Sequence, residues 1–297
     1  MAKLNSSEQR ILDEVAGWKG ESPSFLNRAT DVVSKPINWL TGKLIPDNVR
    51  EGAAAATDKI AEKLQDVSQY TVDKASVLKA TREFEIDSET ILELKKASIF
   101  DLDNVAQKFI DNNTRVATIS GAGTGMVGWA GLLADLPTLF MLSLRTIHQI
   151  AICYGFDLED ENNSEAHRNF ETGYMMRVFK VATSSDVVQK QRGLSELKDY
   201  EAGRELELEG GVGNDFATKQ VSKNATKFLS QRIIREIVEQ TISKKAAALV
   251  PGLGAVFSAG FNYVYLKDVG EAAFMLYRER FLLDKKGRCM VINIEIE

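Results

Sequence analysis

Apolar residues are concentrated in two stretches of the chain. Residues 116–144 read VATISGAGTGMVGWAGLLADLPTLFMLSL and contain one charged residue, Asp135. Residues 246–266 read AAALVPGLGAVFSAGFNYVYL and contain none. A helix of about 20 apolar residues crosses a bilayer, so each stretch is long enough for one span or for a helix pair folded back on itself. We call them the first and second apolar runs.

Both apolar runs carry small or helix-breaking residues at short intervals. They are Gly121, Gly125, Gly128 and Gly131 in the first run, and Pro251, Gly252, Gly254 and Gly260 in the second. Small side chains let two helix backbones approach closely. We therefore predict two glycine-rich helical hairpins that pack against each other. Two environments fit this pattern: the buried centre of a soluble helical protein, or a hairpin that touches or enters a membrane.

Elsewhere, apolar residues recur every three or four positions, which is the spacing of amphipathic helices. Helices are predicted over 6–20, 71–82, 101–112, 164–183 and 263–283, and another begins at Pro46. The fold class is therefore all-α, a multi-helix bundle around the two apolar runs. We expect an N-terminal amphipathic segment over 1–34, a helical domain over 35–283 and a tail over 284–297. Within that domain, the charged stretch 184–214 ends in EGGVGN and predicts a mobile linker.

Charge and cysteine content narrow the class of protein. The chain has 37 basic and 42 acidic residues, a net charge of −5, which argues against a general nucleic-acid binder. Two cysteines are too few for a disulfide framework and fit a reducing cytosol. Glu8, Asp13 and Glu14 stand where a signal peptide needs an apolar core, so we expect a cytoplasmic protein.

Seven basic residues and two acidic ones lie between positions 219 and 245. Lys219, Lys223 and Lys227 follow at four-residue steps and form one helix face. A basic helix that leads into an uncharged run is attracted to an anionic membrane surface, by about 1 kcal/mol per basic residue. An ordinary solvent-exposed helix face is the alternative. We expect a membrane surface or membrane protein as partner, with the chain peripheral to or partly inserted in the inner membrane; a homo-oligomer is a further alternative.

Asp135 is the one charge inside the first run, and such a carboxyl must be paired, hydrated or protonated. Our interpretation is that it caps a helix that starts at Pro137. The alternative is a soluble hydrolase-like enzyme with a small-molecule pocket near Asp135, Arg145, His148 and Asn262.

The residues predict no catalytic, metal-binding or cofactor-binding set. Two histidines, His148 and His167, leave little material for a metal site or a serine triad. Gly123, Gly125 and Gly128 spell G-x-G-x-x-G, but the acidic residue that a dinucleotide site needs about 20 positions later is missing. No cofactor is therefore expected.

The segment GAGTGMVGWAGLLADLPTLFMLSLRTIHQIAICYGFD, and VPGLGAVFSAGFNYVYLKDVGEAAFMLYRERFL about a hundred residues later, resemble the EcsC family of bacterial proteins. Its elements occur in order as Asp135, Pro137, Arg145, Tyr154, Gly155 and Asp157. With WLTGKLIPDNV, the resemblance covers roughly residues 35–283. It implies a membrane-associated or partner-binding accessory protein of unknown activity, from a family named after a gene neighbour of an ABC-type exporter. It supplies no catalytic residues.

Overall fold

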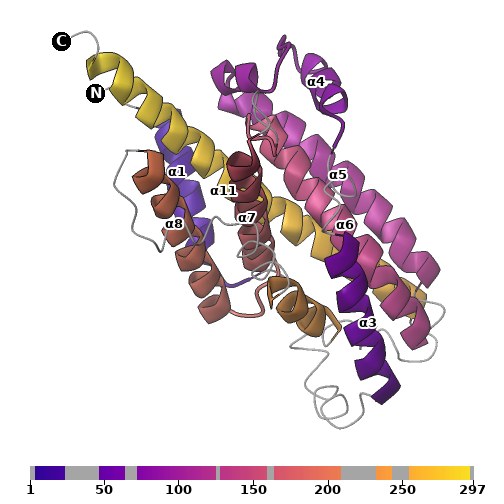
Figure 1. Ribbon diagram of the computed structural model, residues 1–297. Coiled ribbons are helices and arrows are strands. Elements are labelled where there is room, and N and C mark those ends of the chain that lie inside the picture. Colours follow the sequence, from indigo (N-terminus) through magenta and orange to yellow (C-terminus); the bar gives the residue numbers. More distant parts are fainter. Residues whose placement is uncertain are drawn as a thin grey trace.

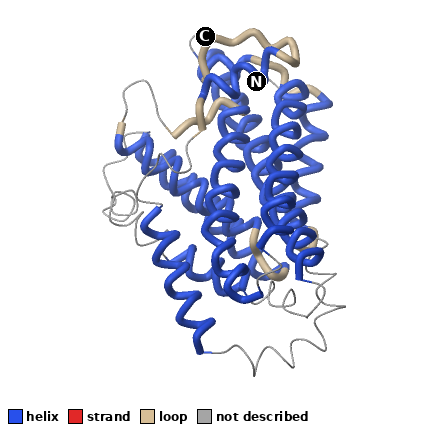
Figure 2. The backbone as a smooth tube through the Cα atoms, turned by 90° about the vertical axis from the view of Figure 1, so that its right-hand side faces the viewer, coloured by secondary structure: helices blue, strands red, loops and turns tan. Residues whose placement is uncertain are grey.

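The structure is a computed structural model that describes residues 4–23, 47–63, 72–124, 128–158, 164–208, 232–242 and 254–294. All regular elements in these ranges are helices, as Figure 2 shows, so the predicted all-α class is confirmed. Gly125, Pro251, Gly252, Lys219, Lys223 and Lys227 lie outside the described residues. The basic stripe of the three lysines and the bend at Pro251 therefore stay predictions.

Three long helices form the centre of the bundle: α5 (Ile99–Thr124), α6 (Gly128–Cys153) and α11 (Gly254–Ile294). They lie side by side in Figure 1, and α11 packs on both α5 and α6. The first apolar run occupies the end of α5 and the beginning of α6, and the second run opens α11. The described parts of the two runs therefore pack against each other, as predicted.

Shorter helices surround this centre. Helices α7 (Glu165–Ala182) and α8 (Val187–Leu208) pack as a pair, and α7 also contacts α6 and α11. Helix α1 (Ser6–Gly20) lies on α11 and α8, while α3 (Asp47–Lys63) lies on α6. Helix α4 (Lys74–Arg82) contacts α5 and α6, and the 3-10 helix η2 (Leu92–Lys96) precedes α5. Residues 232–242 are also helical.

Gly121 lies at a close approach of α5 and α11. An ideal Cβ at this position would lie 2.6 Å from the carbonyl oxygen of Ser258 and 2.7 Å from Nδ2 of Asn262. Only a residue without a side chain fits there, which is the packing role predicted for the glycines. Gly260 does not share that role, because it is exposed and a Cβ there would meet open space.

The other predicted packing glycines are placed as follows. Gly131 is buried within α6, while Gly128 and Gly254 are the first residues of α6 and α11.

Residues 187–208 form α8, whereas the charged composition predicts a linker over 184–214. The buried face of α8 explains the difference. Its buried positions include Lys190, Gly193, Leu197 and Tyr200, which recur at three and four residues, but two of them are not apolar. The pattern of apolar residues alone therefore does not show the helical period of this segment. Residues 209–214 lie outside the described ranges.

Helix α1 is joined to the C-terminal half of α11 by three ion pairs. They are Glu8 with Lys285 at 2.5 Å, Glu14 with Arg278 at 3.3 Å, and Lys19 with Glu279 at 2.5 Å. Lys190 of α8 adds a cap, because its ammonium group donates to the carbonyls of Trp18 and Glu21 at the end of α1. Helix α1 thus packs on the helical domain.

Candidate functional site

A buried carboxylate connects the three central helices. Asp135 of α6 is 1% exposed. Its Oδ1 accepts a hydrogen bond from the Ser120 hydroxyl of α5 at 3.1 Å, and its Oδ2 accepts one from Nδ2 of Asn262 of α11 at 2.9 Å. Asn262 also donates to the carbonyl oxygen of Ala117 at 3.1 Å. We call Asp135, Ser120 and Asn262 the Asp135 cluster. It lies between the two apolar runs and fixes the register of α5, α6 and α11.

The interpretation of Asp135 as a helix cap is wrong. Helix α6 begins at Gly128 and continues through Pro137, so Asp135 lies in its interior. The proline removes one amide donor but does not end the helix, since α6 is buried against neighbouring helices. The carboxylate instead accepts hydrogen bonds from side chains of the neighbouring helices α5 and α11.

The proposed pocket of Asp135, Arg145, His148 and Asn262 does not form as one site. Only Asp135 and Asn262 meet. Arg145 is exposed, and His148 is thirteen positions from Asp135, about 20 Å along the helix at about 1.5 Å per residue. The physical reason is the helical geometry of α6, which carries these side chains to different faces and depths of the bundle.

His148 belongs to a second buried cluster, centred on Asp157. Its Nε2 lies 3.1 Å from Oδ1 of Asp157, the same oxygen that accepts the amide of Leu158 at 2.8 Å. Lys74 of α4 pairs with the other carboxylate oxygen, and Nε2 of His167 lies 2.9 Å from the Asp157 carbonyl. Burial alone would raise the pKa of Asp157, but the hydrogen bonds from His148 and Lys74 lower it below the ordinary value.

Gly155 makes the turn that brings Asp157 back toward His148. It has a φ of +81°, the left-handed conformation that glycine adopts readily after the end of a helix. The Asp157 cluster therefore ties the turn after α6 to α4 and α7.

A third buried polar group links α7 to α11. Arg280 donates two hydrogen bonds of 2.7 Å to the carboxylate of Glu171. The guanidinium also lies over the rings of Phe156 and Tyr174, at 4.0 and 4.4 Å from their centroids. Although burial disfavours its charged form, Glu171 raises the pKa of Arg280. Such a pair is a structural contact, because both partners are already engaged with each other.

A fourth buried group lies where α5, α6 and α11 meet. The Tyr154 hydroxyl donates to Asp103 at 2.6 Å, and Arg278 pairs with the same carboxylate at 2.9 Å. Burial raises the pKa of Asp103 and raises the pKa of Tyr154 well above its ordinary value. Burial also raises the pKa of the Cys153 thiol, so a reactive thiolate is disfavoured.

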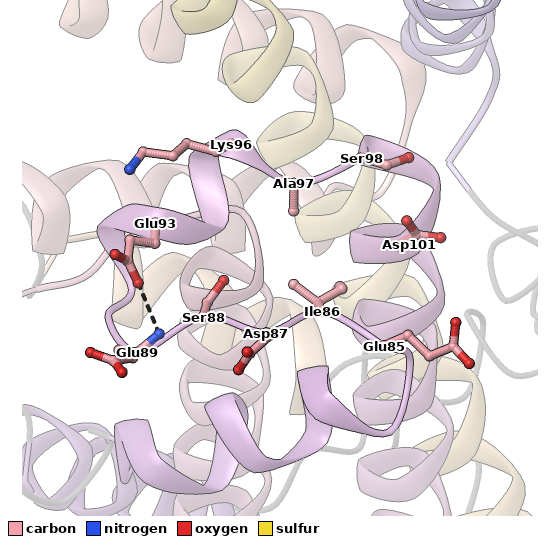
Figure 3. A pocket seen from close by; sticks show the side chains of 10 residues that line it. All are labelled: Glu85, Ile86, Asp87, Ser88, Glu89, Glu93, Lys96, Ala97, Ser98 and Asp101. Atoms are coloured by element: carbon pink, nitrogen blue, oxygen red, sulfur yellow. Dashed lines mark hydrogen bonds between the residues drawn. The ribbon is translucent and has the colours of Figure 1, made fainter.

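Figure 3 shows a surface cavity of about 500 Å³ between α4 and the start of α5. Its lining comprises Glu85, Ile86, Asp87, Ser88, Glu89, Glu93, Lys96, Ala97, Ser98 and Asp101. Acidic side chains predominate, so the cavity favours cations over anions. Among the described residues, however, no group of three or more His, Cys, Asp or Glu side chains is placed to hold a metal ion.

Sequence reasoning missed the Glu171–Arg280 pair, the Asp103 group and this cavity. The partners within the first two lie on separate helices, 109 residues apart for Glu171 and Arg280. No short motif signals such a contact. The sequence shows the spacing of Tyr154, Gly155 and Asp157. The roles of Tyr154 and Asp157 become clear only from their partners Asp103, His148 and Lys74 in the structure.

These observations define an all-α protein whose apolar centre is held in register by buried polar clusters. In the described residues, these clusters join helices and do not assemble the candidate enzyme site. Residues 9–282 match the EcsC protein family, so the chain belongs to that family. The match includes most of α1 and confirms the resemblance.

Two proteins of Bacillus subtilis strain 168 are similar over most of their length. The uncharacterised protein YdbA is 29% identical over 252 residues, which cover 83% of this chain and 83% of YdbA. Protein EcsC is 26% identical over 234 residues, which cover 77% of this chain and 84% of EcsC. No solved structure matches the chain.

Proposed function

We propose that the protein is a membrane-associated accessory factor that attaches to the cytoplasmic face of the inner membrane through one end of its central bundle. This end comprises residues 116–124 of α5, 128–144 of α6 and 254–266 of α11, and we call it the uncharged end. Its only charged residue is Asp135, which is buried. The observation that carries the proposal is that apolar side chains are exposed on three helix segments that themselves carry no exposed charge.

The exposed apolar side chains at the uncharged end are large. Ile119 and Val116 of α5 are 75% and 54% exposed, and Tyr263 of α11 is 44% exposed. Exposed apolar surface that lacks charge is typical of protein or membrane contacts. Helix α3 covers part of α6 here, with Gly52 against Leu133, and turns charged residues such as Asp58 and Lys59 outward.

Shallow insertion is favoured over a complete span. Within the described residues, Leu133–Cys153 is the stretch that is long and apolar enough to cross a membrane by length and composition. However, 78% of its most apolar window is buried inside the protein, which is the behaviour of a core helix. Its apolar surface is thus mainly used within the bundle.

The family resemblance suggests which kind of membrane protein the accessory factor serves. It suggests an ABC-type exporter as a membrane partner, and this suggestion rests on the resemblance alone. The alternative of a soluble hydrolase-like enzyme loses its support, because Arg145 and His148 do not join Asp135 and Asn262.

Co-sedimentation of the full chain with phospholipid vesicles tests the proposal. Ile119→Asp places a charge in the uncharged end, and we expect it to lower the bound fraction severalfold. Val188→Asp is the matched control, since Val188 of α8 is 71% exposed and lies outside that end. It is expected to bind like the unmodified protein. Absence of vesicle binding by the unmodified protein, or equal effects of the two variants, would contradict the proposal.

A further inference from the structure

Basic side chains border the uncharged end on all three helices. The first exposed charge beyond that end is Arg115 on α5, Arg145 on α6 and Lys267 on α11. Between each of them and the helix terminus at the uncharged end, the one acidic residue in the described segments is the buried Asp135 of α6. We call these three residues the basic border.

The helix contacts place Arg115 and Arg145 at a similar level. The hydrogen bonds from Ser120 to Asp135 and from Asn113 to Gln149 connect α5 and α6 on either side of this level. At about 1.5 Å per residue, these contacts put residue 145 within about 8 Å of the level of residue 115.

Lys267 lies at nearly the same level on α11. The contacts of Ala117 with Asn262 and of Ile110 with Gly270 bracket it. They place residue 267 two or three residues from the level of Arg115, about 3 to 5 Å along the helix axis. The basic border is therefore a band across α5, α6 and α11, the three helices that lie side by side in Figure 1.

The uncharged segments are too short to cross the whole hydrocarbon core of a bilayer. From the basic border to the helix termini, the uncharged segments are about 14 Å long on α5, 20 Å on α11 and 25 Å on α6. One hydrocarbon leaflet is about 15 Å thick and the whole core about 30 Å. Inserted at a tilt, the uncharged end fills one leaflet without crossing both. The basic border then lies in the headgroup layer, which long Arg and Lys side chains reach readily.

We infer that the basic border binds the headgroups of anionic phospholipids and sets the depth of insertion. Arginine offers a planar fork of donors that matches phosphate, and lysine adds a point charge. A membrane with anionic lipids thus satisfies both the apolar end and the charges that border it. The inference rests on the proposed function, because it specifies the lipid that the uncharged end meets.

Vesicles of phosphatidylcholine alone, and of phosphatidylcholine mixed with phosphatidylglycerol, test the inference with the full chain. The unmodified protein is expected to bind the anionic vesicles more tightly, with the difference reduced at high salt. The triple variant Arg115→Gln/Arg145→Gln/Lys267→Gln removes the basic border. We expect it to lose about fivefold in affinity per charge, about 100-fold in total, for anionic vesicles only.

The matched control is Arg82→Gln/Arg192→Gln/Lys286→Gln, which removes three exposed basic residues elsewhere. It has the same net charge as the border variant, and we expect affinity within about twofold to threefold of the unmodified protein, because charges remote from the surface are screened. Circular dichroism establishes that both variants are folded. Equal affinity of the two triple variants, or equal binding of the unmodified protein to neutral and anionic vesicles, would overturn the inference while leaving the proposed function intact. Absence of binding to either vesicle would overturn both.

Discussion

Asn262 donates a hydrogen bond of 2.9 Å to the buried carboxylate of Asp135, although 127 residues separate the two in the chain. The contact joins α11 to α6 at the centre of the two apolar runs. A buried carboxylate that loses its donor keeps the full cost of its desolvation. The Asp135 cluster therefore makes the packing of the apolar helices specific as well as close.

Removal of the amide should be costly. We expect Asn262→Ala to lower the free energy of unfolding by about 3 kcal/mol, because it leaves the Asp135 carboxylate with fewer donors and opens a cavity. Urea denaturation followed by circular dichroism measures the change. Tyr263→Ala, at the exposed neighbouring position, should lower it by less than about 1 kcal/mol. Equal losses in the two variants would show that the hydrogen bond has no special role.

The close approach at Gly121 gives a second prediction. Gly121→Ala should destabilise the protein by about 1 to 3 kcal/mol, because the new methyl group collides with Ser258 and Asn262 across the helix contact. Gly123→Ala is the control on the same helix. Its Cβ meets open space, so reduced backbone freedom in the unfolded chain should leave stability unchanged or raise it by up to about 1 kcal/mol. Thermal unfolding of both variants distinguishes packing from helix propensity.

The third prediction concerns acid stability. An aspartate in an unfolded chain titrates near about pH 4, and the pKa of Asp157 is lower in the folded protein. A lowered folded pKa contributes stability that is present above the unfolded value and is lost as pH falls through the folded value. Asp157→Asn should therefore be less stable than the unmodified protein at neutral pH, and the difference should narrow as pH falls below about 4.

Melting temperatures between neutral and acid pH provide the measurement. Asp87→Asn, at an exposed position, is expected to follow the unmodified protein at every pH. A difference for Asp157→Asn that stays constant with pH would mean that the side chain acts through its shape and not its charge.

Local signals in the sequence were sufficient for several elements. The helix predicted over 164–183 is present as α7, where the Ser164 hydroxyl accepts the amide of His167, and Gly155 takes the left-handed conformation after α6. Both depend on residues within a few positions. The close packing of the apolar runs at Gly121 was also predictable, because a glycine at helical spacing in an apolar run has few other uses.

The polar clusters could not be predicted in the same way. Asp135 followed by Leu136 and Pro137 has the composition of a helix start, and only its partner on α11 shows that it is a core residue. The linker predicted over residues 184–214 is wrong for residues 187–208, for a related reason. Lys190 and Gly193 lie on the buried face of α8, yet neither counts as apolar in a sequence pattern. In both cases a tertiary contact determines the structure, whereas the local sequence indicates a helix cap or a linker.

The ion pair between Glu8 and Lys285 holds α1 against the C-terminal half of α11, although 277 residues separate the two. Such closure of the chain makes circular permutation practical. A short peptide could join the outer ends of α1 and α11, and new ends could be opened in a connection on the surface. If the bundle in that rearranged polypeptide kept its packing, the order of synthesis would prove unimportant for assembling the central helices.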